Sequence, residues 1–297
     1  MPTFTIISCA SAIVRAGAKP VLVDSDAKTW NMDISKIEAL ITNKTKAIMA
    51  VHMYGLPVDM DPLLSIVKKY NLKLIEDAAE AIGITYKGKP CGSFGDISTF
   101  SFYPNKNITT GEGGMVLMNN HDLYERCSSL RNLCFQAEKR FVHESLGWNM
   151  RMTNIQAALG VAQLERIDFT VKKKRLIGES YQKLLGNTKG ITLPISYTNY
   201  AENNYWVFGI VLDDYIAADA YDIMNMLADQ KIGTRPFFWS MHEQPVFKKM
   251  AMFKNESHPI SERISRRGFY IPSGLAITND QIEQVSSTLI SIINKVT

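Results

Sequence analysis

The first half of the chain alternates short apolar runs with amphipathic stretches. The runs are rich in β-branched residues and span residues 20–23, 46–51, 73–75, 98–103 and 115–118. Between them, residues 35–41 and 61–70 place apolar side chains at helical spacing, which predicts helices there. Alternation of this kind predicts an α/β fold with a mostly parallel sheet flanked by helices.

The second half follows a different pattern. Residues 153–167 have apolar positions at helical spacing, which predicts a helix that leads into a longer basic helix. Further strands are expected at 205–213 and 233–238, and further helices at 218–230 and 279–295. We therefore expect a large domain at residues 1–168, followed at 169–297 by a linking helix and a small C-terminal α+β domain.

Composition is that of a globular enzyme. The chain has 297 residues, of which 46% are hydrophobic and 21% charged, enough to bury a large core. Its formal net charge of +4 is too small to indicate a nucleic-acid partner. The strongest basic run, residues 172–175, fits a solvated helix face, although a phosphate-bearing ligand would also be attracted to it.

Neither the cysteines nor the opening residues indicate export. The four cysteines have no Cys-x-x-Cys or histidine-rich spacing, which argues against a metal site and a disulfide framework. The apolar segment at residues 4–12 lacks a preceding basic stretch and continues into a strand-like pattern, unlike a signal peptide. No apolar run is long enough to span a membrane, so we expect a cytoplasmic protein.

Candidate chemistry lies in two segments that follow predicted strands. Residues 93–114, SFGDISTFSFYPNKNITTGEGG, run from an alternating strand pattern into a turn that carries Lys106. Upstream, a short apolar run ends in Glu76 and Asp77. The carboxyl ends of strands in an α/β sheet line the ligand crevice, so these side chains are expected to converge. A lysine and a carboxylate suit pyridoxal phosphate, whose aldehyde attaches to lysine and whose pyridine nitrogen needs an acid partner.

These segments resemble a known family. Residues 76–83 (EDAAEAIG), 92–114 and 147–168 (GWNMRMTNIQAALGVAQLERID) resemble the DegT/DnrJ/EryC1/StrS sugar aminotransferases, which are fold-type I pyridoxal phosphate enzymes. Weaker similarities at residues 2–24, 51–60 and 270–282 follow in the same order. Within the family the chain looks most like the GDP-perosamine synthases.

The resemblance implies roles for four side chains around the cofactor. Lys106 is the Schiff-base lysine and later the acid/base, a role that requires a lowered pKa. Asp77 pairs with the pyridinium nitrogen, and Glu80, one helical turn further if a helix has begun, contacts the phenolic oxygen. Ser101 binds the cofactor phosphate. Taken singly, Lys106 is also consistent with a solvated turn, Asp77 with a helix cap and Ser101 with a core hydroxyl.

Other positions are implied at the edges of the site. Asn149 and Arg151 match residues that reach the phosphate of the partner subunit, which implies a homodimer with shared active sites. Ile6 stands where many relatives stack an aromatic ring on the pyridine, with Phe4 as the alternative if the register shifts by two.

The substrate pocket is the least defined part of the site. Residues 234–245, TRPFFWSMHEQP, resemble the segment near the sugar-nucleotide pocket, where Arg235 and His242 can contact phosphate or sugar hydroxyls. Tyr103 is a further candidate for a substrate contact. A histidine in such a loop is as often packed against its neighbours as it is in contact with a ligand.

One family feature is missing from the chain as given. Relatives begin with a Gly-Ser-Gly-Thr-Ala-type segment that holds the cofactor phosphate at a helix N-terminus, whereas this sequence opens inside the following strand. We therefore expect an N-terminally incomplete large domain, which puts the activity of this chain in doubt. The glycines at 111, 113 and 114 are expected to allow a tight turn rather than to cradle phosphate.

The resemblance implies transfer of an amino group, from glutamate by analogy, to a keto group of a nucleotide-linked deoxysugar. One example is the conversion of GDP-4-keto-6-deoxymannose to GDP-perosamine for a surface polysaccharide. Two alternatives stay open. A sugar 3-dehydratase of the same family would carry histidine in place of lysine, so Lys106 speaks against it. A scaffold that has lost its phosphate loop is the other.

Overall fold

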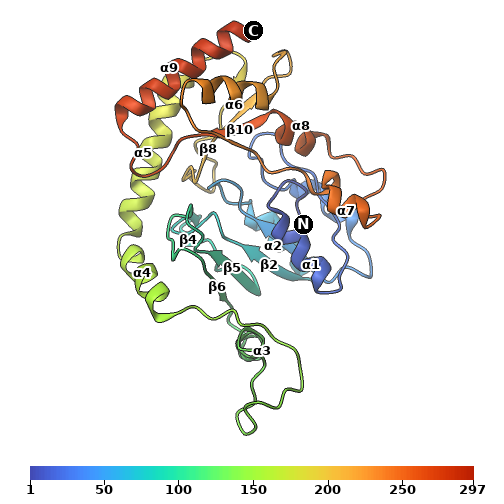
Figure 1. Ribbon diagram of the computed structural model, residues 1–297. Helices are drawn as coiled ribbons and strands as arrows, with labels where there is room; N and C mark the ends of the chain where they lie inside the picture. The colour runs from blue at the N-terminus through green and yellow to red at the C-terminus, as the bar shows by residue number, and fades with distance from the viewer.

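The computed structural model describes residues 1–297, and two four-stranded sheets form its frame (Figure 1). The first sheet has the order β1-β2-β5-β6, with bounds β1 Ala47–Val51, β2 Lys73–Asp77, β5 Ile97–Ser101 and β6 Gly114–Leu117. The first three strands are parallel, and β6 runs antiparallel to β5. The expected mostly parallel sheet is therefore confirmed.

The register of this sheet brings polar residues to one edge. Val51 pairs with Asp77, and Asp77 pairs with Thr99, so β1, β2 and β5 end close together. Helix α2 (Met60–Lys69) connects β1 to β2 and buries Met60, Leu63 and Ile66. Because the strands are parallel and in register, the segments that leave their carboxyl ends start from the same edge.

The second sheet belongs to the later part of the chain. Its order is β7-β8-β10-β9, with bounds β7 Ile191–Thr192, β8 Phe208–Leu212, β10 Gly268–Ile271 and β9 Arg235–Pro236, and every pairing is antiparallel. Helices α5 (Ile167–Leu185), α6 (Ala220–Asp229) and α9 (Asn279–Val296) share one apolar core with it. All five residues of β8 are buried, as expected of a strand covered on both faces.

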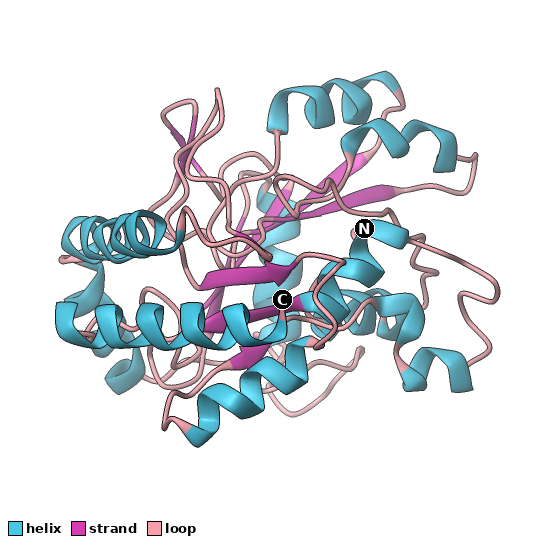
Figure 2. Ribbon diagram, turned by 90° about the horizontal axis from the view of Figure 1, so that it is seen from above, coloured by secondary structure: helices cyan, strands magenta, loops and turns pink.

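Helices lie around the outside of both sheets (Figure 2). Helices α4 (Asn154–Leu164) and α5 follow one another along one side and lead from the first sheet to the second (Figure 1). A Thr153 and Gln156 capping box starts α4. The remaining elements are α1 Ile7–Arg15, η1 Ile34–Lys36, η2 Glu38–Leu40, β3 Thr85–Tyr86, β4 Lys89–Pro90, α3 His121–Arg131, η3 Met241–Glu243, α7 Pro245–Lys249 and α8 Pro259–Arg267.

A second apolar core joins the start of the chain to its later part. It combines Phe4 and Tyr54 with Trp206 and Phe237, all of them buried. The Phe4 ring centroid lies 5.8 Å from that of Tyr54, and the Tyr54 centroid lies 4.8 Å from that of Phe237. Because aromatic residues from distant segments interlock here, the two sheets are held in a fixed arrangement.

Several expectations about local structure are wrong. Residues 20–23 form no strand, and Val23 makes only an isolated bridge with Pro2. Residues 35–41 fold into the two short 3₁₀ turns η1 and η2. The strand-like opening becomes helix α1 from Ile7 onward, because its small residues Cys9 and Ala10 form a buried helical face. Tertiary packing decides such short apolar segments.

The loop after Lys106 is only partly as expected. Gly111 and Gly113 have φ angles of 78° and 148°, which favour glycine. Gly114 does not have a positive φ, and it is needed for a different reason. A Cβ atom there would lie 2.7 Å from the Phe100 carbonyl oxygen.

None of the helices has the length and hydropathy needed to cross a membrane.

The packing of β8 leads to a stability prediction. Phe208 is fully buried between the rings of Tyr181 and Tyr205, so Phe208→Ala should lower the free energy of unfolding by about 3 to 5 kcal/mol. Urea unfolding followed by circular dichroism measures this change. Phe141→Ala is the matched control because Phe141 is 80% exposed, and equal effects of the two substitutions would contradict the described core.

Candidate active site

A cavity of about 650 Å³ lies between the turn that carries Lys106 and the second sheet. Helix α5 contributes Lys174 to its wall, and the segment before β8 contributes Trp206. Arg235 of β9 and Tyr270 of β10 complete the lining from the second sheet. None of the 16 lining residues is acidic, so the cavity favours an anionic ligand.

The Lys106 amine is held by a carboxylate and an aromatic ring. Its Nζ lies 3.5 Å from Glu80 Oε1 and 3.8 Å from the centroid of the Trp206 ring. The Trp206 indole donates a hydrogen bond to the Asn105 carbonyl oxygen at 2.9 Å, which fixes the ring against the lysine's own turn. The amine is therefore positioned by an ion pair and a cation–π contact while its side chain stays 11% exposed.

Glu80 is buried, and burial changes the proton affinity of its carboxyl. Burial raises the pKa of its carboxyl to about 7, although the Lys106 ammonium opposes the rise. Its Oε2 accepts a hydrogen bond from the Tyr54 backbone N–H at 2.8 Å. Glu80 lies in a turn rather than in the expected helix, because the chain forms consecutive turns after β2. The Glu80 carboxyl can thus take up or release a proton next to the Lys106 amine.

Asp77 ends β2 with its carboxylate free of any ion pair. Its Oδ1 accepts from the Ala79 backbone N–H at 3.0 Å, and its Oδ2 accepts from the Cys9 thiol at 3.2 Å. Burial is the main cause of the raised pKa of Glu80. The negative charge of Asp77 raises it further, so these two carboxylates are neighbours. A carboxylate whose partners are an amide and a weak thiol donor is available to a stronger donor.

Glu76, next to Asp77 in the strand, has a structural role instead. Successive strand residues point to opposite faces, and Glu76 is fully buried. Its carboxylate bonds to His52 Nε2 at 2.9 Å and accepts from the backbone N–H groups of residues 92, 94 and 95 and from the Ser98 hydroxyl. Burial would raise its pKa, but these partners lower it to about 2. Glu76 therefore anchors the segment that enters β5.

The expected phosphate contacts lie on exposed or half-buried segments. The Ser101 hydroxyl accepts a hydrogen bond from the Tyr103 backbone N–H at 3.3 Å, and Ser101 is half-buried. Arg151 Nε donates to Asn149 Oδ1 at 3.0 Å, and both residues are exposed. Tyr103 is 49% exposed and does not line the cavity. The ligand roles of these residues stay predictions.

The two stacking candidates are placed differently. Ile6 precedes α1 and is 39% exposed, so its side chain is accessible. Phe4 is fully buried among Tyr54, Phe237 and Phe238. The structure therefore removes Phe4 as the alternative stacking residue, because a ring enclosed by the protein core has no face to offer.

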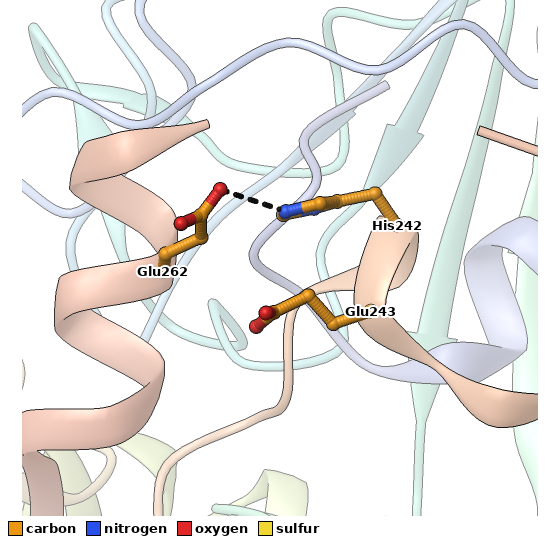
Figure 3. Close-up of side chains that lie close together, drawn as sticks. All are labelled: His242, Glu243 and Glu262. Carbon is orange, nitrogen blue, oxygen red and sulfur yellow. Dashed lines mark hydrogen bonds and ion pairs between the residues drawn. The ribbon is translucent and has the colours of Figure 1, made fainter. Parts of the chain in front are cut away.

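His242 differs from the expectation of a substrate contact. Both ring nitrogens are used within the protein. Nε2 lies 3.0 Å from Glu262 Oε1 (Figure 3), and Nδ1 lies 3.0 Å from Thr3 Oγ1. Glu243 and Glu262 both form ion pairs with Arg266, which compensates their charge. His242 is also absent from the cavity lining, whereas Arg235 is part of it. This cluster is a packed polar network.

Sequence reasoning missed three side chains at the site. Trp206 falls in a stretch predicted as strand, although β8 begins at Phe208. Cys9 contacts Asp77 across 68 residues of sequence, and no role at the site was predicted for it. Lys174 lies in a basic run that was assigned to a solvated helix face, yet it is 5% exposed and lines the cavity. Only the burial face of α5, revealed by helical spacing, could have indicated it.

The fold and this site define an aminotransferase of the pyridoxal phosphate type. The sequence profile of the DegT/DnrJ/EryC1/StrS aminotransferase family matches residues 1–290, and the chain belongs to this family. It is 43% identical over 289 residues to GDP-perosamine synthase from Escherichia coli O157:H7, covering 97% of this chain and 77% of the relative. The Vibrio cholerae GDP-perosamine synthase is 38% identical, with 99% and 79% covered.

Solved structures agree with this assignment. DesV from S. venezuelae superposes with a TM-score of 0.90 at 28% identity, covering all of this chain and 78% of DesV. DesI, crystallised in the presence of its TDP-sugar product, has a TM-score of 0.88 at 28% identity, with 99% and 74% covered. The sequence-based assignments of family and fold are confirmed.

The buried Glu80 leads to a pH prediction. Its pKa is about 7 in the folded chain and lies near the ordinary glutamate value of 4.5 when the chain is unfolded, so the folded state binds the proton more tightly. The free energy of unfolding should therefore fall as pH rises from about 4.5 to about 7, by at most about 3 kcal/mol. Glu80→Gln should remove this part of the dependence.

Urea midpoints at pH 5 and pH 7.5, with no added cofactor, measure the effect. Glu138→Gln is the control, because Glu138 is exposed and its loss leaves the cavity unchanged. Identical pH dependence in the wild type and in Glu80→Gln would rule out the burial of an ionisable carboxyl at this position.

Proposed function

We propose that the chain transfers an amino group from an amino acid, glutamate, to a keto group of a nucleotide-linked deoxysugar, with pyridoxal phosphate as cofactor. The observation that carries the proposal is the Lys106 amine, held between Glu80 and Trp206 in the wall of a cavity without acidic lining. Membership of an aminotransferase family supports it.

The residues present fit the cofactor. Lys106 would take the aldehyde carbon, Asp77 the ring nitrogen and Glu80 the phenolic oxygen. Asp77 is suited to this because it forms no ion pair and accepts only from an amide and a thiol. The Ser101 hydroxyl still has its proton to donate to a phosphate oxygen. When bound, pyridoxal phosphate supplies an electron sink that acidifies the C–H bond next to the transferred amine.

The chain's own groups then move protons. The Asp77 carboxylate would hold a proton at the ring nitrogen. The Lys106 amine would act as the base that takes a proton from the substrate carbon and as the acid that returns it. Glu80, whose pKa is about 7 through burial, supplies or accepts a proton at the phenolic oxygen without a net change of charge in the cavity.

The substrate follows from the relatives. Two similar proteins are named GDP-perosamine synthase, and DesI has a TDP-sugar product. We infer a nucleotide-linked keto sugar as amino acceptor, with GDP-4-keto-6-deoxymannose as the first candidate and a surface polysaccharide as the destination. The cationic lining of the cavity supports a ligand that carries a diphosphate. We place this reaction in the cytoplasm.

We also propose that the chain works as a homodimer. Strand β6 exposes Met115, Val116 and Leu117, and α4 exposes Ile155 and Leu159. Exposed apolar surface of this kind is typical of a subunit interface. Asn149 and Arg151 lie on the segment that leads into α4, where a second subunit would bring them to its neighbour's phosphate.

Replacing the lysine tests the assignment directly. Pyridoxal phosphate added to the protein should give visible absorption, and borohydride reduction should fix the cofactor on the peptide that contains Lys106. Lys106→Ala should lose the colour, the fixed label and amino transfer together. Lys183→Ala, an exposed lysine, is the control. Amino transfer that survives in Lys106→Ala would refute the role of this residue.

Replacing the carboxylate separates attachment from chemistry. Asp77→Asn keeps the size of the side chain but removes the charge opposite the ring nitrogen, so borohydride should still fix the cofactor on Lys106. The kcat for amino transfer should fall by about 10²- to 10³-fold, as for loss of one electrostatic stabiliser. Asp168→Asn, on an exposed residue, should leave kcat unchanged. A wild-type kcat in Asp77→Asn would exclude this role.

A further inference from the structure

Lys174 is a buried cation in the wall of the cavity. It belongs to the basic run 172–175, but α5 turns it inward together with Val171, Ile177 and Tyr181. Its neighbours in the run behave differently, since Lys172 is exposed and Arg175 pairs with Glu202 at 2.8 Å. Lys174 is 5% exposed and donates to the Ser273 carbonyl oxygen at 2.6 Å.

No carboxylate compensates this ammonium. Lys174 forms no ion pair, and burial lowers its pKa to about 7. An ammonium has three N–H donors, of which the Ser273 carbonyl takes one. Removing a cation from water without a counter-ion costs several kcal/mol. The folded protein would therefore be more stable with a hydrophobic residue at this position. A lysine at such a position is explained by an anion that arrives with the ligand.

The same wall carries a second cation without an acid partner. Arg235 lines the cavity and forms no ion pair, whereas Lys106 is paired with Glu80. Two basic side chains of the lining thus have no acidic partner within the protein. A ligand group with two negative charges would balance them, and phosphate oxygens accept well from both side chains.

We propose that Lys174 and Arg235 form an anion subsite that binds the diphosphate of the nucleotide-linked substrate. The inference rests on the proposed function and names the residues of its acceptor pocket. Two carboxylates of the amino donor carry the same charge, so the donor is the other source of such a dianion. The cavity volume of about 650 Å³ favours the larger ligand, because it falls in the range of pockets that enclose a drug-sized molecule.

A merely structural role for Lys174 has a different signature. Its bond to Ser273 ties α5 to the segment after β10, and glutamine, although one bond shorter, still offers an uncharged N–H donor toward that carbonyl. Lys174→Gln therefore removes the charge but keeps a donor. If Lys174 had only a structural role, this change would leave ligand affinity unaltered. If Lys174 binds the anion, the change would lower ligand affinity.

Binding to the full chain tests the proposal, with GDP and glutarate as probes in isothermal titration calorimetry. Lys174→Gln should weaken GDP binding by about 10- to 100-fold, as expected for the loss of a charged hydrogen bond. Its effect on glutarate should stay within about twofold. Lys172→Gln is the matched control, because it removes the same charge from an exposed position of the same run. It should leave both affinities at the wild-type value.

Arg235→Gln provides a second test on an exposed residue, so that a folding defect in Lys174→Gln does not decide the question. It should also weaken GDP binding. Wild-type GDP affinity in folded Lys174→Gln, or in Arg235→Gln, would overturn the two-cation subsite. Loss of glutarate binding alone would assign the dianion to the amino donor and overturn the diphosphate assignment.

These outcomes are independent of the proposed catalysis. Fixation of the cofactor on Lys106 and transfer of the amino group are measured separately from GDP affinity. A chain that binds GDP through Lys174 but does not carry the cofactor would refute the transaminase. A working transaminase with unchanged GDP affinity in both variants would refute only the subsite.

Discussion

The structure depends most on the contact between one amine and one buried carboxyl. Glu80 is enclosed by the fold, and its proton affinity is raised because burial outweighs the attraction of Lys106. The lysine in turn is fixed by the Trp206 ring, which comes from the segment before β8. This contact therefore requires both sheets to be in place. It places a carboxyl whose pKa is raised to about 7 within 3.5 Å of the Lys106 amine at the wall of the cavity.

A second carboxylate, that of Glu76, supports this contact by holding together the strands beside it. Glu76 gathers His52, three backbone amides and a hydroxyl around itself, and so ties β1, β2 and the entry to β5 into one unit. Its neighbour Asp77 faces the other way and keeps its oxygens for weaker partners. The two adjacent acids thus have different roles because successive strand residues point to opposite faces of the sheet. The first is saturated with donors and supports the frame, while the second is left able to bind.

The sequence predicted the strands of the first sheet and the helices α2, α4, α5, α6 and α9, because each has several residues of consistent periodicity, whereas the 11-residue helix α3 was not predicted. It placed Lys106, Asp77 and Glu80 in one site through the resemblance and through the strand ends. Prediction from the sequence failed where the structure is determined by packing and distant contacts rather than by neighbouring residues. Residues 20–23 and α1 are short apolar segments whose conformation depends on packing. Trp206 and Cys9 reach the site through contacts with residues far away in the sequence, which no local pattern records.

Lys174 shows why a charge run has to be judged residue by residue. A helix that repeats every 3.6 residues cannot keep four consecutive cations in solvent when one of its faces is packed. One of the four must turn inward, and in α5 it is the residue that points at the cavity. Helical periodicity therefore places most of the run in or near solvent and one of its basic side chains, Lys174, in the wall of the cavity. An anion bound beside Lys174 would offset the cost of burying its ammonium, which would couple ligand binding to the packing of α5.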